Sequence, residues 1–394
     1  MKNLVIFFEI VIREFRRFLK NKVALAIFLG APLLYGPVFG LLYTDAQLYD
    51  TPVVVVDYDR SPLSDRITDA LNEQENIAVS AVHYEEFSLQ NGFIQGEYYA
   101  IVVIPEGFEA GVLQKRTPEI RVDVNASNMV ITNYTVRAIQ QVLATMDAGV
   151  RIETLKREGV PPQIAEERHQ AFSINYQRYF NPSNNYLIFL LPGLLGMVLQ
   201  QVFLLVLAIS FSQEFEERTF SQLTDKTRSA FLLLLSKTFP YWVIGMLMWL
   251  LSLHGILYYF GVPVDGRLPG IYLFSLLFVM SMSSIGILVS VAIPSQLKAT
   301  EILMVVAAPA FLISGFTWPL YQMPDSVQYI ASLIPTTHFL EGFRKMILAG
   351  ARLEHLQSEV LALVLLTMIP YLFTLLIIKI RIGKTCKESK MEQA

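Results

Sequence analysis

The stretch YLIFLLPGLLGMVLQQVFLLVLAIS, residues 186–210, decides the fold because it contains no charged side chain. A helix needs about 20 predominantly apolar residues to cross the hydrocarbon core of a bilayer, and a stretch of this length and composition meets that requirement. We therefore interpret it as a transmembrane helix rather than as the buried helix of a soluble protein.

Five more apolar runs flank this stretch and cover residues 23–43, 239–260, 271–293, 300–318 and 360–380. The composition agrees, since 53% of the residues are hydrophobic and 16% are charged, whereas roughly a quarter of a soluble domain is charged. The sequence therefore predicts an α-helical polytopic membrane protein with six transmembrane helices. The last five of them form a transmembrane domain over residues 186–380.

Basic residues gather before the first apolar run and after the last. They are Lys2, Arg13, Arg16, Arg17, Lys20 and Lys22 at one end, and Lys379, Arg381, Lys384, Lys387 and Lys390 at the other. Short flanking segments rich in Lys and Arg stay in the cytoplasm. Both termini, including the basic tail 381–394, are therefore predicted to be cytoplasmic, which requires an even number of crossings.

Residues 1–22 are predicted to form a cytoplasmic amphipathic helix that lies at the membrane surface. One face would carry Leu4, Phe8, Val11, Phe15, Phe18 and Leu19. The opposite face would turn Arg13, Arg16, Arg17 and Lys20 toward anionic lipid. The alternative is a plain basic anchor that only fixes the topology.

A polar block, residues 44–185, separates the first two predicted spans and alternates strand-like with helix-like segments. The strand-like segments are 52–57, 78–83, 99–104 and 119–124, and the helix-like segments are 63–73, 85–95, 107–114 and 128–158. Such alternation is typical of a compact α/β domain on a small sheet. Because the termini are predicted inside, we expect an inserted extracytoplasmic α/β domain between the first and second spans.

The sequence lacks the motifs that would support catalysis within this chain. It has no Gly-x-x-x-x-Gly-Lys-Ser/Thr loop for ATP phosphates, no His-Glu-x-x-His motif and no Gly-x-Ser-x-Gly motif. Its single cysteine, Cys386, excludes an intrachain disulfide. The histidines lack metal-ligand spacing, and no clustered basic face indicates nucleic-acid binding. We therefore expect no catalytic residue, no metal site and no nucleic-acid partner.

A charged segment, residues 213–228, connects the second and third predicted spans. As a helix it would place Phe215, Thr219, Gln222 and Leu223 on one face, and Glu214, Glu217 and Arg218 on another. A short charged helix with a small apolar patch suits docking into a groove on a cytoplasmic partner. The alternative is a solvated loop.

Residues 319–350 follow the fifth predicted span and combine prolines with moderately apolar sequence. Pro319, Pro324 and Pro335 would each end one short helix and start the next. This pattern fits broken helices that dip into the outer leaflet, with Trp318 and Tyr321 at the interface.

These two segments make the chain resemble the permease subunit of type-2 ABC exporters, in the drug-efflux branch with a large extracytoplasmic domain. The resemblance covers nearly the whole chain. Three positions depart from the family's pattern: Arg218 and Ser236 stand where Gly is usual, and Thr227 stands where Pro is common. These departures affect the expected geometry of docking to the ATPase.

The resemblance implies a subunit that is not itself an enzyme, in the bacterial inner membrane. It would export a hydrophobic or amphipathic compound such as a drug-like molecule, a lipid or a glycolipid. ATP and Mg²⁺ would bind to separate cytoplasmic ABC ATPase subunits, and this chain would bind no cofactor. A second permease subunit would complete a homodimer or heterodimer, and a periplasmic adaptor with an outer-membrane duct could follow.

The resemblance also implies two sets of site residues. The ATPase-coupling residues would be Glu214, Phe215, Glu216, Glu217, Arg218, Thr219 and Leu223. The residues of the outer gate would be Gly315, Trp318, Pro319, Pro324, Pro335 and His338.

Polar residues within the predicted spans include Gln200, Gln201, His254, Ser281, Ser283 and Ser284, of which Gln200, Gln201, His254 and Ser284 are the candidates for a substrate path. Such side chains are costly when they face lipid. They would either form hydrogen bonds between helices or line a substrate path, and the sequence leaves both interpretations open.

Two functions from other classes are alternatives. A membrane-anchored sensor could bind a ligand in the extracytoplasmic α/β domain, but the sequence offers no cytoplasmic output domain. A membrane transferase or hydrolase would need convergent acids, histidines or a nucleophile, and none is apparent.

Overall fold

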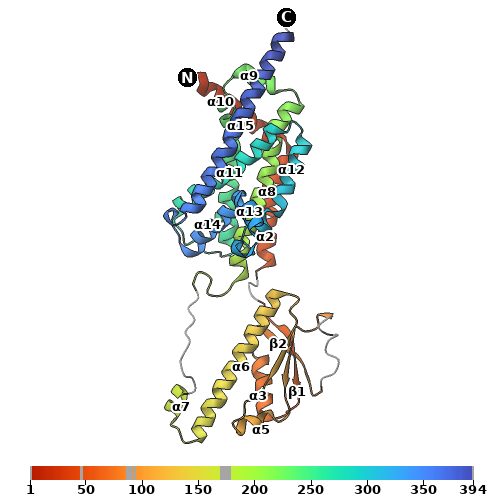
Figure 1. Cartoon of the computed structure of the whole chain (residues 1–394), viewed down its shortest axis with the longest axis vertical. Helices are drawn as coiled ribbons and strands as arrows, with labels where there is room; N and C mark the ends of the chain where they lie inside the picture. Colours follow the sequence, from red (N-terminus) through yellow and green to blue (C-terminus); the bar gives the residue numbers. More distant parts are fainter. Residues whose placement is uncertain (1, 45–47, 86–91, 93–94, 169–178, 393–394) are drawn as a thin grey trace. The chain divides into compact units, whose positions relative to one another are not determined.

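The computed structural model describes all residues except 1, 45–47, 86–91, 93–94, 169–178 and 393–394 (Figure 1). The chain divides into two compact units. One comprises residues 47–178, and the other comprises residues 1–46 together with 179–394. We describe each unit by itself.

The larger unit is helical and contains the membrane spans. Within the described residues, 6 helices are long and apolar enough to cross a membrane, which confirms the predicted number of candidate spans. They are α2 (Lys22–Leu42), α8 (Tyr186–Glu216), α10 (Ala230–Leu251) continued by the π-helical turn η1 (Ser252–Leu257), α11 (Leu268–Ala292), α12 (Gln296–Ile313) and α15 (Gln357–Glu392).

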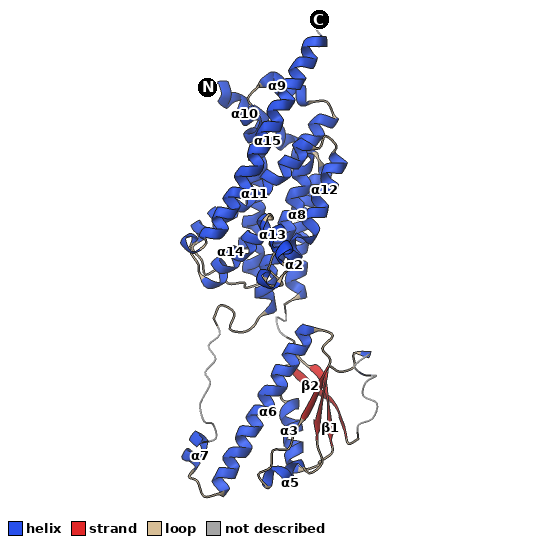
Figure 2. Ribbon diagram, in the orientation of Figure 1, coloured by secondary structure: helices blue, strands red, loops and turns tan. Residues whose placement is uncertain are grey.

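Helix α8 forms the centre of this unit and packs against α2, α11, α12 and α14 (Figure 2). In its apolar window 72% of the residues are buried, compared with 22% in α2 and in α15. Small residues allow neighbouring helices to approach α8 closely. A Cβ atom added to Gly286 of α11 would lie 2.7 Å from the Cβ of Leu207 in α8, so the two helices pack at a distance that only a small residue allows.

Several observed helix boundaries differ from the predicted ones, and two of these differences have clear local reasons. Helix α10 begins nine residues before the predicted start at 239, because the side chain of Ser229 caps it by accepting a hydrogen bond from the N–H of Leu232. Helix α12 ends at Ile313 rather than at 318, because Gly315 adopts a left-handed conformation with φ of 80°.

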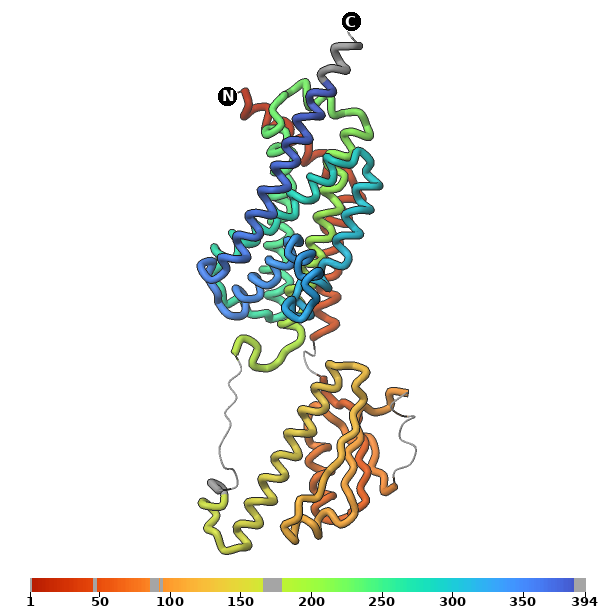
Figure 3. The backbone as a smooth tube through the Cα atoms, in the orientation of Figure 1, coloured from red at the N-terminus to blue at the C-terminus, as the bar shows by residue number. Residues whose placement is uncertain are grey.

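The ends of the helical unit differ in structure. The N-terminal helix α1 (Lys2–Lys20), the short helix α9 (Phe220–Lys226) and the C-terminal end of α15 lie at one end (Figure 3). The other end carries η2 (Leu320–Gln322), α13 (Asp325–Ser332), α14 (Pro335–Ala349) and η3 (Leu353–His355). Pro319 and Pro324 are the N-caps of η2 and α13, and Pro335 opens α14, as the proline pattern predicts.

The smaller unit has a four-stranded sheet with the order β2-β1-β3-β4. Its elements are β1 (Thr51–Asp57), α3 (Pro62–Asn72), β2 (Ile77–His83), β3 (Ala100–Ile104), α5 (Phe108–Leu113), β4 (Arg121–Val124), α6 (Met129–Arg157) and α7 (Pro162–Arg168). β1 pairs in parallel with β2 and β3, whereas β4 pairs antiparallel with β3. The strands lie within two residues of their predicted positions, but most of the predicted helix 85–95 lies outside the described residues.

The core of this unit lies mainly between the sheet and helices α3 and α6. Alternate residues of β1 point to opposite faces. Val53 and Val55 pack with α3 and α6, whereas Val54 and Val56 pack with Tyr98 on the other face. Because β1 and β3 are buried on both faces, they read as nearly continuous apolar runs.

Candidate functional site

A buried carboxylate, Glu214, lies near the C-terminal end of α8 and binds cations from two other helices. Its side chain is fully buried. Arg13 of α1 binds it in a bidentate manner, with Nη1 2.7 Å from Oε1 and Nη2 3.0 Å from Oε2. Nζ of Lys237 in α10 donates to Oε1 over 3.0 Å. Bidentate, charge-assisted bonds of this kind are among the strongest hydrogen bonds in proteins.

Three more side chains complete the group, which we call the Glu214 cluster. Arg17 of α1 contacts both Glu214 and Glu217. Glu14 lies 3.0 Å from Nζ of Lys237 and 3.2 Å from Arg13. The cluster therefore contains the cations Arg13, Arg17 and Lys237 and the anions Glu14, Glu214 and Glu217, so that its charges balance.

The balance of positive and negative charge matters because the centre of the cluster is buried. Lys237 and Glu214 are both 0% exposed, and Glu14 is 1% exposed. An uncompensated charge at such a depth would cost several kcal/mol. Burial alone would lower the pKa of Arg13, but the Glu214 carboxylate raises it above its ordinary value, so Arg13 stays protonated. The cluster consequently fixes α1, α8 and α10 to one another.

The chain turns sharply just after Glu214. Helix α8 is capped at Glu217, and Arg218 adopts a left-handed conformation with φ of 57°. The hydroxyl of Thr219 then donates to Glu214, and α9 begins at Phe220. Only Gly adopts a positive φ without strain, which gives a physical reason for the Gly that is usual at position 218 in the type-2 ABC pattern.

The predicted helix 213–228 is therefore divided into the end of α8, a turn and α9. As a result, the side chains that are accessible differ from those that a single helix would expose. Phe215 is half-buried beneath the guanidinium of Arg381, 4.1 Å from the ring centre. Leu223 is buried in the core of this chain. The expected apolar docking patch is thus occupied by the chain's own fold, and the expectation of a free apolar face is wrong.

The exposed part of this region is polar. It consists of Glu216, Glu217, Arg218, Ser221, Gln222, Asp225, Lys226 and Arg228. Lys226 binds Glu9 of α1 over 2.8 Å, and Glu216 accepts a hydrogen bond of 2.7 Å from the side chain of Gln296. The surface beside the Glu214 cluster is therefore a polar one that contacts α1 and α12.

Helix α1 also differs from its expected arrangement. Arg13 and Arg17 turn toward Glu214 and not toward lipid, whereas Leu4, Phe8 and Leu19 are more than half exposed. The pairing of Arg13 and Arg17 with Glu214 was not predicted from the sequence. A signal was present, since Lys237 occurs within an otherwise apolar helix and Glu14 lies on the same helix as the two arginines.

The predicted residues of the outer gate are not brought into one site. Trp318 is 52% exposed, and Nε2 of His338 lies 2.9 Å from the backbone oxygen of Ser332. Gly315 and the prolines shape the backbone, as described above. A separate ion-pair group joins α14 to α15, since Nζ of Lys345 lies 2.6 Å from Glu359.

The polar residues of the spans differ in their contacts. Ser284 donates to the backbone oxygen of Leu366 over 2.8 Å and so connects α11 to α15. His254 lies in the π-helical turn and contacts the hydroxyl of Tyr272 at 2.7 Å. Gln200 is buried, and its Oε1 has no hydrogen-bond partner among the described residues, whereas Gln201 is half-buried. Ser284 and His254 therefore both make contacts between helices.

Comparison with known proteins finds several similar transport proteins, three of which follow. The chain is 29% identical over 195 residues to the probable multidrug ABC transporter permease YbhS of Escherichia coli, which is 48% of this chain and 51% of YbhS. It is 24% identical over 375 residues to the inner membrane transport permease YhhJ of Escherichia coli, which is 92% of this chain and 94% of YhhJ. It is 22% identical over 376 residues to ABC transporter G family member 20 of Dictyostelium discoideum, which is 91% of this chain and 48% of that protein. The matches thus span about half the length of YbhS and of the Dictyostelium protein.

The sequence pattern of the ABC-2 family transporter proteins matches residues 22–380. This match includes the six candidate spans, the turn after Glu214 and the short helices after α12, whereas α1 precedes it. The resemblance to type-2 ABC permeases is confirmed. The chain is a multi-pass membrane protein that belongs to the ABC-2 family of transporter proteins.

Proposed function

We propose that this chain is the permease subunit of an ATP-driven exporter in a bacterial inner membrane. It would move a hydrophobic or amphipathic compound, such as a drug-like molecule, a lipid or a glycolipid, out of the cytoplasm or the inner leaflet. ATP and Mg²⁺ would bind to separate ABC ATPase subunits. Family membership and the names of YbhS and YhhJ support a transport role.

One observation carries the mechanical part of this proposal: the Glu214 cluster lies directly beside an exposed polar turn. The ion pairs connect the turn to α1, α8 and α10. A force on α9 would therefore move the connected helix ends together rather than bend the turn alone. Packed helices of this kind switch between discrete arrangements instead of deforming continuously.

In this mechanism the end of the unit with both chain termini is cytoplasmic, and the ATPase contacts the exposed side chains of α9. Nucleotide binding would favour one of two arrangements of the helices. The segment 319–350 at the opposite end would open the exit. A second permease subunit, identical or related, would enclose the substrate path with this one.

The α/β unit would lie outside the cytoplasm. It would cap the exit or receive a periplasmic adaptor that leads to an outer-membrane duct. The sensor alternative is not favoured, because the transporter family match covers residues 22–380, which include the α/β unit as well as the spans.

The test is capture of the ATPase from mild detergent. The double variant Gln222→Arg/Asp225→Arg changes exposed side chains of α9 and leaves the Glu214 cluster intact. We expect it to lose the co-purifying ABC ATPase and its stimulated ATP hydrolysis. The matched control is Glu354→Arg, an exposed charge reversal in η3 at the other end of the unit, which should retain both. Equal capture by the two variants would contradict docking through α9.

A further inference from the structure

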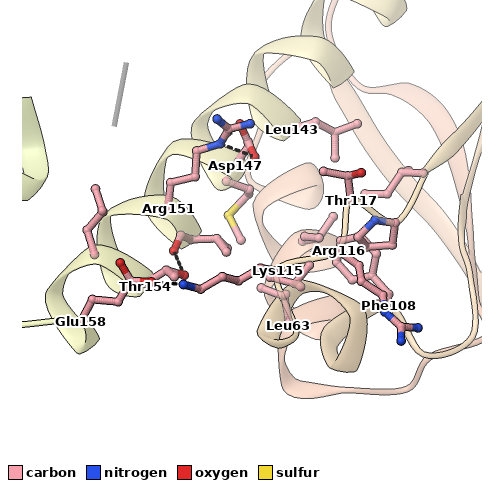
Figure 4. A pocket seen from close by; sticks show the side chains of 17 residues that line it. Leu63, Phe108, Lys115, Arg116, Thr117, Leu143, Asp147, Arg151, Thr154 and Glu158 are labelled. Atoms are coloured by element: carbon pink, nitrogen blue, oxygen red, sulfur yellow. Dashed lines mark hydrogen bonds and ion pairs between the residues drawn. The ribbon is translucent and has the colours of Figure 1, made fainter. Parts of the chain in front are cut away.

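A cavity of about 810 Å³ opens within the α/β unit, between α6 on one side and α3, α5 and the segment 115–120 on the other (Figure 4). Its volume falls within the range of roughly 300–1,000 Å³ that is typical of pockets for drug-sized molecules. All its lining residues belong to this unit, so the cavity is a property of the α/β unit itself.

The cavity exists because α6 is longer than the sheet core that it covers. Ala138, Ile139 and Val142 in its first half are buried among the strands. Farther along, Met146 and Val150 are only half-buried and line the cavity. Leu63, Ile67 and Phe108 form the opposite wall. The walls are thus apolar and include a flexible Met, a residue that adapts to ligands of different shape.

Charged side chains surround this apolar interior. Lys115 pairs with Glu158, and Nε of Arg151 lies 3.0 Å from Asp147. Arg116 also lines the cavity but has no ion-pair partner among the described residues. The charged lining therefore contains three cations and two anions, which leaves one positive charge uncompensated.

The backbone at the rim is strained. The N–H groups of Lys115 and Arg116 bond to the carbonyl oxygens of Val112 and Gly111 and close helix α5 in a Schellman motif. Lys115 occupies the left-handed position of this motif with φ of 59°, where Gly is usual. Strained residues are common at ligand-binding positions, and this one brings a cation to the cavity, where it pairs with the end of α6.

We propose that this cavity binds an amphipathic organic anion, with the apolar body between α3 and α6 and the acidic group at Arg116. A fatty carboxylate has this chemistry. The site would bind such a molecule without ATP or a partner subunit, so the proposal is independent of the transport mechanism.

The experiment uses the full chain in nanodiscs with a diazirine-bearing laurate, and the labelled peptides are mapped by mass spectrometry. We expect saturable labelling of peptides from residues 108–120 and 143–158. Arg116→Gln should raise the probe concentration at half-saturation about tenfold, which is the loss of affinity expected for one charge-assisted contact. Val150→Trp, which fills the cavity, should abolish saturable labelling. Arg137→Gln is the matched control on α6, because Arg137 is exposed and does not line the cavity, and it should label normally.

Three results would overturn the proposal. One is labelling confined to the membrane helices. Another is equal labelling by the matching lauryl alcohol probe, which would remove the role of the anion. The last is full labelling of both Arg116→Gln and Val150→Trp. Because Arg116 is exposed, Arg116→Gln should fold normally. This variant therefore still tests the proposal if Val150→Trp is too unstable to be measured.

Discussion

Two groups of charged residues in this protein use the same side-chain types in opposite ways. In the Glu214 cluster three cations meet three anions, and the central pair has no access to solvent. At the cavity of the α/β unit the ion pairs are exposed, and Arg116 has no ion-pair partner in the part of the chain that the structure describes. Balanced buried charge holds helices in register, whereas unbalanced exposed charge leaves an interaction available for a ligand.

The largest expected effect comes from removing the buried cation. Lys237→Met removes the fully buried cation that contacts Glu14 and Glu214 and leaves them only the partly exposed arginines as cationic partners. Breaking a buried pair in this way costs about 3–5 kcal/mol. Thermal unfolding of the purified protein in detergent measures the loss. Lys226→Met removes an exposed pair with Glu9 and should cost less than about 1 kcal/mol. Similar losses in both variants would mean that the Glu214 cluster gains nothing from burial.

A smaller effect is expected when one of the arginines that contact Glu214 is removed. Arg13→Gln deletes the bidentate contact but leaves Lys237 and Arg17 in place, so we expect a loss of about 2 kcal/mol. Limited proteolysis should then cut between α1 and α2 roughly 30-fold faster. Arg16 is exposed and lies outside the cluster, and Arg16→Gln should be cut at the normal rate. Normal protection of α1 in Arg13→Gln would refute the role of this contact.

The α/β unit offers a prediction with a pH dependence. Burial would raise the pKa of Asp59, but hydrogen bonds from Ser61 and from the N–H groups of Phe108 and Glu109 lower it below its ordinary value. A lowered pKa stabilises the fold above the ordinary Asp pKa of about 3.9, and this contribution is lost as the pH falls through the folded-state value.

Asp59→Asn should therefore cost about 1–2 kcal/mol at neutral pH and should remove part of the acid sensitivity. Hydrogen exchange of the β1 and β3 amides reports the change in this unit alone. An unchanged acid profile in Asp59→Asn would show that the carboxylate contributes nothing.

The smallest expected effect has the opposite sign. Arg218→Gly removes the strain of a positive φ, worth roughly 1–2 kcal/mol, but increases the chain entropy lost on folding by roughly 0.5–1 kcal/mol. We expect a net gain of about 0.5 kcal/mol in thermal unfolding. Arg218→Ala is the control, because it removes the same side chain without relieving the backbone, and it should show no gain.

Local signals made much of the fold predictable. The span 186–210 needed only its length and lack of charge, and the strands β1 and β3 were evident as short apolar runs between turn residues. The pairing of Arg13 with Glu214 was not predictable in this way, because 201 positions separate the two residues. The burial of Leu223 was missed for a related reason: helical periodicity shows which side chains share a face but not what that face contacts.

The Glu214 cluster also has a consequence for biosynthesis. Helix α1 leaves the ribosome long before Glu214 and Lys237, so its arginines cannot yet bind Glu214 while the first span inserts. During that interval they are free to act as topological signals at the membrane surface. Once α8 and α10 are in place, the same arginines become ligands of a carboxylate. In the proposed topology, with the N-terminus in the cytoplasm, one short helix would first orient the nascent chain and later complete its assembly.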